Sequence, residues 1–231
     1  CALPISCHAI GTAYETPQGS VQVGEGCNAT MTAFSFHPVK TIAMGEGGAV
    51  TTDDAELAAR LRLLRSHGMV REPAHFIQHG EAFDADGTPN PWYYEMTEPG
   101  HNFRASDIHC ALGVSQLGKL DRFVAARRRL VARYDRMLAP LAPRVRPIGR
   151  VAGCDPAWHL YVVLIDFGAL GLTRASVMRR LAERGIGTQV HYLPVNRQPY
   201  YRGRYGEIAL PGADAYYARC LSLPLFAGMA L

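Results

Sequence analysis

Apolar and polar residues alternate along this chain in patterns that predict both strands and helices. Residues 7–50 predict short strands and turns, and residues 48–52 predict a strand that follows a glycine-rich turn. Asp53 or Asp54 is suited to cap a following helix, because a carboxylate accepts hydrogen bonds from the first free backbone N–H groups. Gly68 is suited to end that helix. Three leucines at helical spacing mark its apolar side: Leu57, Leu61 and Leu64.

A second pattern predicts one long helix over residues 106–138. It starts at Ser106, and Pro140 and Pro143 end it, because proline lacks the backbone N–H that a helix needs. Residues 69–99, before this helix, are rich in proline and glycine and predict a long loop, which is usually functional or disordered. The apolar residues of the helix recur near helical spacing: Ile108, Leu112, Leu117, Leu120, Phe123, Leu130, Tyr134 and Leu138.

The C-terminal part of the chain predicts a small α/β domain. Residues 158–166 are a nearly continuous apolar run rich in valine and isoleucine, which predicts a buried strand. Thr173 is positioned to cap a helix that runs through Arg184, with Gly185 just beyond its end. Residues 188–193 predict another strand. The order of strand, helix and strand indicates an α/β fold.

Composition narrows the functional classes. Among 231 residues, 48% are hydrophobic and 19% charged, which is typical of a soluble globular protein with a buried core. The net charge is +4, and clusters such as Arg127–Arg129 are interpreted either as solvated helix faces or as attraction for a diphosphate. The sequence has no stripe of basic residues interleaved with aromatic residues, the pattern that would indicate a nucleic-acid partner. It also has no apolar run as long as a membrane span.

The cysteines do not indicate a metal site. The chain has six of them, at positions 1, 7, 27, 110, 154 and 220, and no Cys-x-x-Cys pair. We therefore expect no zinc and no other metal. They are too scattered for a disulfide framework, so we interpret most of them as small apolar residues of a protein in the reducing cytoplasm.

Lys40 is the candidate for covalent chemistry. It lies on a short turn between apolar stretches, with Ser35 before it and Gly45, Gly47 and Gly48 after it. A lysine amine reacts with an aldehyde only when neutral, and partial burial favours the neutral form. Glycines let the backbone approach a flat ligand closely. On spacing alone, a lysine on a surface loop beside a glycine-rich turn is the more common case, since most lysines are solvated.

Longer motifs add to this picture. Residues 35–52 read SFHPVKTIAMGEGGAVTT, and further motifs follow at 90–96, 100–108, 185–201 and 215–226. Together they resemble the DegT/DnrJ/EryC1/StrS family of pyridoxal-phosphate (PLP) sugar aminotransferases. The later motifs resemble the branch that makes UDP-4-amino-4,6-dideoxy-N-acetyl-β-L-altrosamine for pseudaminic acid synthesis. The similarity runs from about His8 to the last residue.

The resemblance implies a fold, a cofactor and partners. The fold is the α/β fold type I of PLP-dependent transferases, like aspartate aminotransferase. Residues 1–118 would be the trailing part of the large PLP-binding domain, and 119–231 the small C-terminal domain. The cofactor is pyridoxal 5'-phosphate. The substrates are a UDP-linked 4-keto-6-deoxy-N-acetylhexosamine and an amino-acid donor, expected to be glutamate, and the protein is expected to be a homodimer with shared active sites.

Site residues also follow from the resemblance. Lys40 matches the lysine that bonds to PLP and then moves protons, and Ser35 matches the phosphate-binding serine. Asn102 matches an asparagine that reaches the cofactor phosphate of the neighbouring subunit, although a turn residue is the simpler alternative. His8 takes a position near the cofactor ring, or is a buried structural histidine. Four residues match a substrate-contacting strand, where His191 either bonds the sugar or faces solvent: Gln189, Val190, His191 and Tyr192.

Three further observations leave the activity of this chain open. Ile5 stands where the family has an aspartate that holds the pyridine nitrogen protonated, and isoleucine cannot stabilise that charge. Asn28, Thr30 and Asn196 also depart from the branch pattern. The family has a long segment before His8 and a final helix after Phe226, so this chain is expected to be a fragment. An inactive truncated remnant is therefore the alternative to an enzyme, whereas Lys40 argues against the related dehydratases, which have histidine there.

Overall fold

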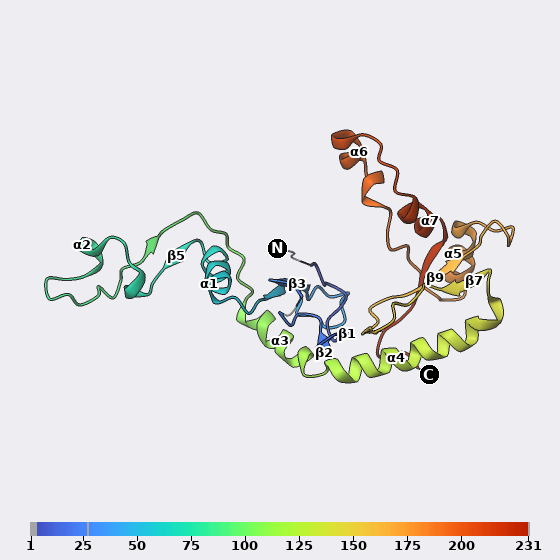
Figure 1. Cartoon of the computed structure of the whole chain (residues 1–231), viewed down its shortest axis with the longest axis horizontal. Coiled ribbons are helices and arrows are strands. Elements are labelled where there is room, and N and C mark those ends of the chain that lie inside the picture. Colours follow the sequence, from blue (N-terminus) through green and yellow to red (C-terminus); the bar gives the residue numbers. More distant parts are fainter. Residues whose placement is uncertain (1–3, 27, 231) are drawn as a thin grey trace. The chain divides into compact units, whose positions relative to one another are not determined.

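A computed structural model describes residues 4–26 and 28–230 (Figure 1). The chain divides into two compact units. The first contains the residues up to 7 together with 24–117, and the second contains 8–23 and 118 onward. The expected division into a large and a small domain at residue 118 stays a prediction. No helix in the described ranges combines the length and apolar character needed to cross a bilayer.

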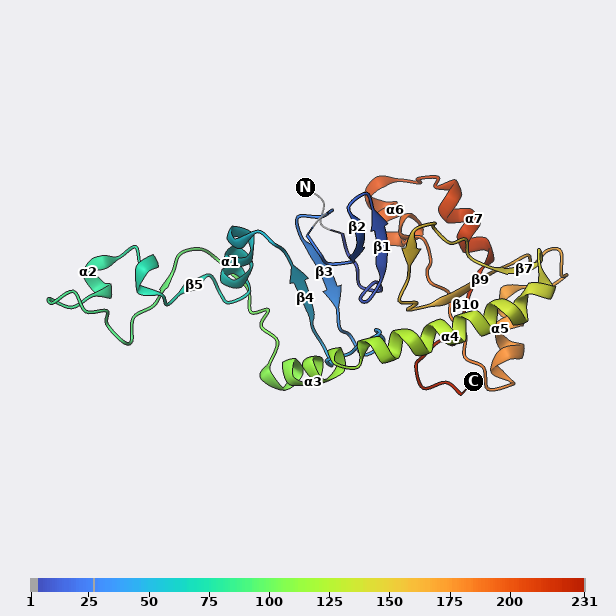
Figure 2. The same ribbon diagram turned by 60° about the horizontal axis from the view of Figure 1, so that its bottom comes forward.

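A two-stranded antiparallel sheet organises the first unit. It consists of β3 (Thr32–Ser35) and β4 (Gly48–Thr51), with Ser35 opposite Gly48, and Figure 2 shows the two strands side by side. Ile5 pairs in parallel with Ala33, and the Ser6 N–H donates to the Ala33 carbonyl at 2.8 Å. The predicted strand at 48–52 is thus confirmed, one residue shorter.

The predicted helix after β4 is confirmed as α1 (Ala55–Leu64). The Asp54 carboxylate caps it, accepting from the N–H groups of Glu56 at 2.9 Å and Leu57 at 3.0 Å. The helix ends before Gly68, whose N–H returns to the Leu63 carbonyl at 3.0 Å with φ of 68°. A glycine is required here because a Cβ would lie 1.8 Å from the Glu98 carbonyl oxygen.

Residues 69–99, which we call the arm, are more ordered than the predicted loop. The arm carries four short elements: β5 (Met69–Val70), η1 (Pro73–His75), α2 (His79–Ala82) and β6 (Glu95–Met96). β5 and β6 pair as an antiparallel ladder, with Met69 opposite Met96. Figures 1 and 2 show the arm extending from α1 as a long excursion of the chain. Proline and glycine content predicted the turns but not this ladder, because the paired strands are 25 residues apart in the chain.

The prediction of one long helix over 106–138 was wrong. The structure has two helices, α3 (Asp107–Leu117) and α4 (Leu120–Leu138), separated by Gly118 and Lys119. Lys119 has ψ near 0°, outside the helical range, and Gly118 has low helix propensity. The predicted stop is confirmed, because α4 passes into the 3₁₀ turn η2 (Ala139–Leu141), which contains Pro140.

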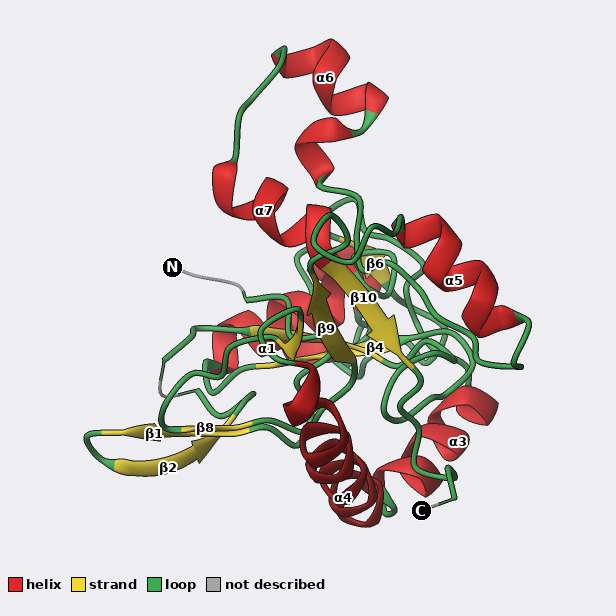
Figure 3. Ribbon diagram, turned by 90° about the vertical axis from the view of Figure 1, so that its right-hand side faces the viewer, coloured by secondary structure: helices red, strands yellow, loops and turns green. Residues whose placement is uncertain are grey.

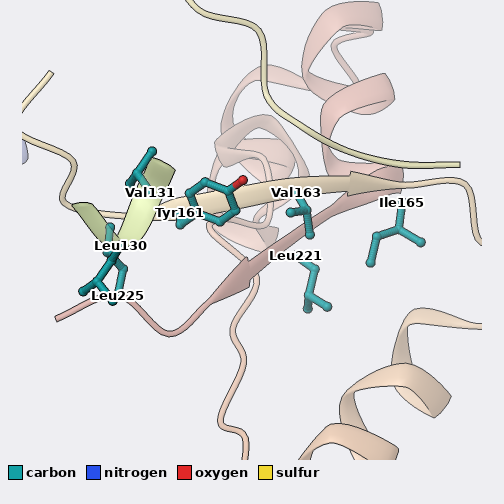
Figure 4. Close-up of a cluster of buried hydrophobic side chains, with 7 residues drawn as sticks. All are labelled: Leu130, Val131, Tyr161, Val163, Ile165, Leu221 and Leu225. Carbon is teal, nitrogen blue, oxygen red and sulfur yellow. The ribbon is translucent and has the colours of Figure 1, made fainter. Parts of the chain in front are cut away.

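The second unit is built around an antiparallel sheet in the order β10–β9–β7. The central strand β9 (Tyr161–Ile165) confirms the predicted buried strand, and its neighbours are β7 (Val145–Pro147) and β10 (Cys220–Leu223). Side chains from α4 pack on this sheet (Figure 4). The buried cluster contains Leu130, Val131, Tyr161, Val163, Ile165, Leu221 and Leu225.

Helices and a small ribbon complete the second unit. The predicted helix is confirmed as α5 (Arg174–Ala182), where Thr173 and Ser176 form a reciprocal capping box. A second sheet joins β1 (Ala13–Thr16), β2 (Gly19–Gln22) and β8 (Cys154–Asp155) (Figure 3). The chain also forms η3 (Val195–Arg197), α6 (Pro199–Tyr205) and α7 (Pro211–Arg219).

The predicted strand at 188–193 was wrong. Only Gln189 pairs with a neighbouring strand, through an isolated antiparallel bridge to Ser222 of β10. The two hydrogen bonds of this bridge are 2.8 and 3.2 Å long. Gly187 and Pro194 flank the segment, and both residue types disfavour a longer ladder.

The cysteines fit the prediction of small apolar residues only in part. Cys220 is fully buried in β10 and Cys7 is half-buried, whereas Cys110 and Cys154 are exposed. These four are free thiols. Cys1 and Cys27 lie outside the described residues.

A buried arginine joins the elements of the second unit. Arg127, on α4, is 6% exposed, and its Nη1 donates to the carbonyls of Trp158, His159 and Leu225 at 2.9–3.1 Å. Burial lowers the pKa of this guanidinium, but an arginine that starts so far above neutral stays charged. One side chain therefore ties α4 to the chain before β9 and to the chain after β10.

We expect Arg127→Met to lower the free energy of unfolding by about 3 kcal/mol, because it leaves buried carbonyls without donors. Arg129→Met on the same helix, where the arginine is exposed, is the matched control and should change it by less than about 0.5 kcal/mol. Urea denaturation followed by circular dichroism measures both. Equal effects of the two substitutions would contradict the structural role of Arg127.

Candidate functional site

The candidate residues lie in both units. Lys40, Ser35 and Asn102 belong to the first unit, and His8 and the 189–192 segment belong to the second. In the first unit, β3 ends at Ser35 and β4 begins at Gly48, so Lys40 lies on the loop between paired strands. We call residues 36–47 the lysine loop.

Backbone hydrogen bonds close the lysine loop. The Phe36 N–H donates to the Gly47 carbonyl, and the Met44 N–H donates to the Phe36 carbonyl, both at 2.9 Å. Within the loop, the Lys40 N–H donates to the His37 carbonyl at 2.9 Å, which forms a turn. Lys40 itself is half-buried, while Ile42 and Met44 beyond it are buried. The lysine is therefore presented from a closed loop rather than from a loose surface segment.

His37 and Ser35 both contact the turn. The Ser35 Oγ accepts from the His37 N–H at 3.5 Å, and the His37 Nδ1 accepts from the Val39 N–H at 3.3 Å. The His37 Nε2 lies 3.7 Å from the Glu46 carboxylate. These contacts give His37 a role in shaping the loop.

The glycines after Lys40 serve the packing of the loop. A Cβ on Gly48 would lie 2.4 Å from the Phe34 carbonyl oxygen, and one on Gly47 would lie 2.8 Å from the Met44 sulfur. Gly45 has φ of 86°, and its Cβ would lie 3.0 Å from the His109 ring of α3. Close approach of a ligand was the expected reason for these glycines, but the chain's own atoms fill the space beside them.

Asn102 lies in an extended segment rather than in a turn. Its backbone pairs with Ser66, and the neighbouring hydrogen bonds run from His67 to His101 at 2.9 Å and from Phe103 to Arg65 at 3.0 Å. The Asn102 side chain is exposed. An exposed amide on a well-paired segment is available to a second molecule.

In the second unit, His8 is half-buried beside another histidine. The rings of His8 and His159 have centroids 4.1 Å apart at an angle of 35°. This contact is compatible with a buried structural histidine and with a residue near a ring-shaped ligand, so both interpretations of His8 stay open.

The segment from Gln189 to Tyr192 is held by α7 and β10. The His191 Nδ1 lies 2.7 Å from the hydroxyl of buried Ser222, and the Tyr216 hydroxyl donates to the His191 carbonyl at 2.9 Å. His191 is thus half-buried and bonded, not a solvent-facing histidine. Tyr192 is 59% exposed. The side-chain Oε1 of Gln189 accepts from the Val190 N–H at 2.8 Å.

The structure also shows a pocket whose lining includes Tyr93 and Tyr94, two aromatic residues that the sequence places either at the substrate cleft or at an interface. It lies on the arm, has a volume of about 320 Å³, and is lined by aromatic residues, prolines and Arg71. Motif similarity had singled out residues 90–96, but not Trp92 or Arg71 as ligand contacts. The run of three aromatic residues Trp92-Tyr93-Tyr94 was the feature of the sequence that could have predicted this pocket. No local pattern linked Arg71 to it, because Arg71 lies about twenty residues earlier in the chain.

The residues present fit one part of pyridoxal 5'-phosphate and not another. A half-buried lysine amine and a serine hydroxyl at the end of the adjacent strand are suitable donors for its aldehyde and phosphate. At the position expected to hold the ring nitrogen, Ile5 is apolar and 78% exposed. It offers no acceptor for a pyridinium N–H. In the described ranges no group of three or more His, Cys, Asp and Glu side chains is arranged to hold a metal.

Comparison with known proteins identifies the family: the chain belongs to the DegT/DnrJ/EryC1/StrS aminotransferase family, whose model matches residues 5–231. It is 37% identical, over 225 residues, to the spore coat polysaccharide biosynthesis protein SpsC of Bacillus subtilis. This match covers 96% of the present chain and 54% of SpsC. The family is PLP-dependent, so the expected cofactor class and fold type I are confirmed at the level of the family.

Solved structures agree with this assignment. Helicobacter pylori PseC, an aminotransferase involved in the biosynthesis of pseudoaminic acid, superposes with a TM-score of 0.82 at 31% identity, covering 99% of this chain and 55% of PseC. The PLP form of the putative sugar aminotransferase Spr1654 from Streptococcus pneumoniae superposes with a TM-score of 0.79 at 26% identity, covering 98% and 53%. The chain therefore spans about half the length of these relatives.

The packing of the lysine loop predicts the effect of Gly48→Ala. The added methyl group collides with the Phe34 carbonyl and should lower the free energy of unfolding by about 1–3 kcal/mol. Gly80→Ala is the control, because Gly80 has open space around it, and should be neutral or slightly stabilising. Thermal denaturation compares them, and an equal effect would refute the close contact at Gly48.

Proposed function

We propose that this chain forms part of a PLP-dependent sugar aminotransferase with Lys40 as its catalytic lysine. The observation that carries the proposal is the half-buried Lys40 on a closed loop, five residues after Ser35, in a chain that belongs to an aminotransferase family. When bound, PLP supplies an aldehyde that bonds to an amine and a conjugated ring that accepts electrons.

Each residue has a proposed task. The Lys40 Nζ would hold the cofactor at its aldehyde, and as a neutral amine it would serve as the base that moves protons at the substrate carbon. The Ser35 hydroxyl would hold the cofactor phosphate, and the His8 imidazole would serve near the cofactor ring. Asn102 reaches the phosphate of a second subunit, and its exposed side chain on a paired segment supports that task. The protein would then be a homodimer with shared sites.

The proposed substrate is a UDP-linked 4-keto-6-deoxy-N-acetylhexosamine, converted to the 4-amino sugar of the pseudaminic acid pathway in the cytoplasm, with glutamate as donor. Similarity to PseC supports this substrate. The 189–192 segment would contact the sugar. Its support by Ser222 and Tyr216 suits such a task, because a contact residue must be held in place before the substrate arrives.

Lys40 can be tested directly because the chain contains only two lysines, Lys40 and Lys119. After incubation with PLP and reduction with borohydride, we expect a pyridoxyl group on the peptide that contains Lys40. Lys40→Ala should abolish this label, and Lys119→Ala, the matched control, should keep it. Peptide mass spectrometry measures the label, and equal labelling of both lysines would contradict the assignment.

A second candidate is a chain that folds without catalysis of its own. Ile5 favours this candidate, because an exposed isoleucine stands where a carboxylate would hold the pyridinium charge. Turnover of a nucleotide-sugar ketone by the purified chain, with PLP and glutamate added, would eliminate the candidate.

Ile5→Asp should strengthen PLP binding if the cofactor ring lies at that position. A charge-assisted hydrogen bond contributes about 1.5–3 kcal/mol, which corresponds to roughly 10- to 150-fold in affinity. Ile5→Asn, similar in shape but uncharged, should give much less. Fluorescence titration with PLP measures the affinities. Unchanged binding in Ile5→Asp would place the ring nitrogen elsewhere.

A further inference from the structure

Ser222 of β10 contacts the 189–192 segment through three separate hydrogen bonds. Its N–H donates to the Gln189 carbonyl at 2.8 Å, and its own carbonyl accepts from the Gln189 N–H at 3.2 Å. Its hydroxyl lies 2.7 Å from the His191 Nδ1. One residue of a buried strand therefore holds both the backbone of this segment and the imidazole ring two positions further on.

Two further contacts fix the orientation of the His191 ring. The Tyr192 ring meets it edge-to-face at a centroid distance of 4.6 Å, and the Tyr216 hydroxyl donates to the His191 carbonyl at 2.9 Å. Ser222 is 4% exposed, so the Nδ1 faces the interior, whereas the neighbouring Tyr192 is 59% exposed. The two nitrogens of an imidazole point in different directions, so the Nε2 points away from β10.

The burial of Ser222 decides the direction of its bond to His191. Within the part of the chain that the structure describes, the His191 Nδ1 is the partner of the Ser222 hydroxyl. A buried hydroxyl whose proton finds no acceptor costs free energy, and the Nδ1 accepts only when it carries no hydrogen. The geometry therefore favours donation from the Ser222 hydroxyl to the Nδ1. The hydrogen of the neutral ring then lies on the Nε2.

We propose that Ser222 is a positioning residue that holds His191 in the neutral Nε2–H tautomer, so that His191 recognises the substrate as a hydrogen-bond donor. An N–H donor selects an oxygen acceptor on the sugar, such as an acetamido carbonyl, and does not accept a hydroxyl proton. A ring oriented before binding lowers the entropy lost when the ligand arrives. The assignment deepens the proposed function, because it rests on the 189–192 segment contacting a nucleotide sugar.

Nitrogen-15 NMR of the imidazole rings tests the tautomer without any ligand. In the purified chain at about pH 8, where an unperturbed imidazole is neutral, we expect His191 to show a protonated Nε2 and an unprotonated Nδ1. The His191→Gln variant identifies its signals among those of the nine histidines. Ser222→Ala should shift the Nδ1 resonance, because the hydrogen bond to it is lost, and Ser222→Thr, which keeps the hydroxyl, should not. Ser20→Ala, which replaces an exposed serine of β2, is the matched control and should change nothing.

Isothermal titration calorimetry connects the tautomer to the ligand. We expect Ser222→Ala to weaken the binding of UDP-N-acetylglucosamine by about 3- to 10-fold, the effect of one hydrogen bond, and Ser222→Thr to keep it. The binding of UDP alone should be the same in every variant, because the His191 N–H is assigned to the sugar. An equal loss for both ligands would indicate a general defect of packing and would overturn the positioning role.

The proposal is also overturned if the Nδ1 of His191 carries the hydrogen in the unmodified chain, or if Ser222→Ala leaves the Nδ1 resonance unchanged. The spectrum of the unmodified chain decides the tautomer even where Ser222→Ala does not fold. Failure of the unmodified chain to bind UDP-N-acetylglucosamine would contradict the proposed function and the sugar acceptor, whereas the tautomer is decided by NMR alone. Labelling of Lys40 by PLP is independent of these outcomes.

Discussion

The candidate site depends on the close approach of two backbone segments where β3 meets β4. Gly48 lies against the Phe34 carbonyl with no room for a side chain, and the pairing of Ser35 with Gly48 brings both ends of the lysine loop together. The loop is short and closed, so Lys40 starts from a defined position on the segment that follows Ser35. A reactive amine has to be held in this way, because a freely moving lysine loses the advantage of proximity.

The second unit uses a different interaction to the same end. Arg127 is buried and donates to three carbonyls from two distant parts of the chain. Carbonyl oxygens at strand ends have no ladder partner, and the arginine satisfies several of them at once. The sheet, α4 and the C-terminal segment therefore form one support. From this support β10 and α7 hold His191 through Ser222 and Tyr216.

Local signals predicted local structure well. Asp54 and Thr173 cap their helices as expected, because capping depends on residues two or three positions away. The apolar run at 158–166 became β9 for a similar reason, since its hydrophobicity needs burial in any fold. The prediction of a single helix over 106–138 was wrong, because the apolar periodicity continues across Gly118 whereas the helical backbone is interrupted there. The strand at 188–193 was wrong because its partner, Ser222, contributes only one bridge.

The sequence by itself determined the family, the candidate lysine and the helix caps, because these depend on residues close together in the chain. Only the tertiary structure decided why the loop glycines are needed, what Arg127 binds and that Arg71 lies with Trp92 at one pocket. Each of those facts is a contact between residues brought together by packing. Spacing along the chain does not encode such a contact, since many different folds would satisfy the same local pattern.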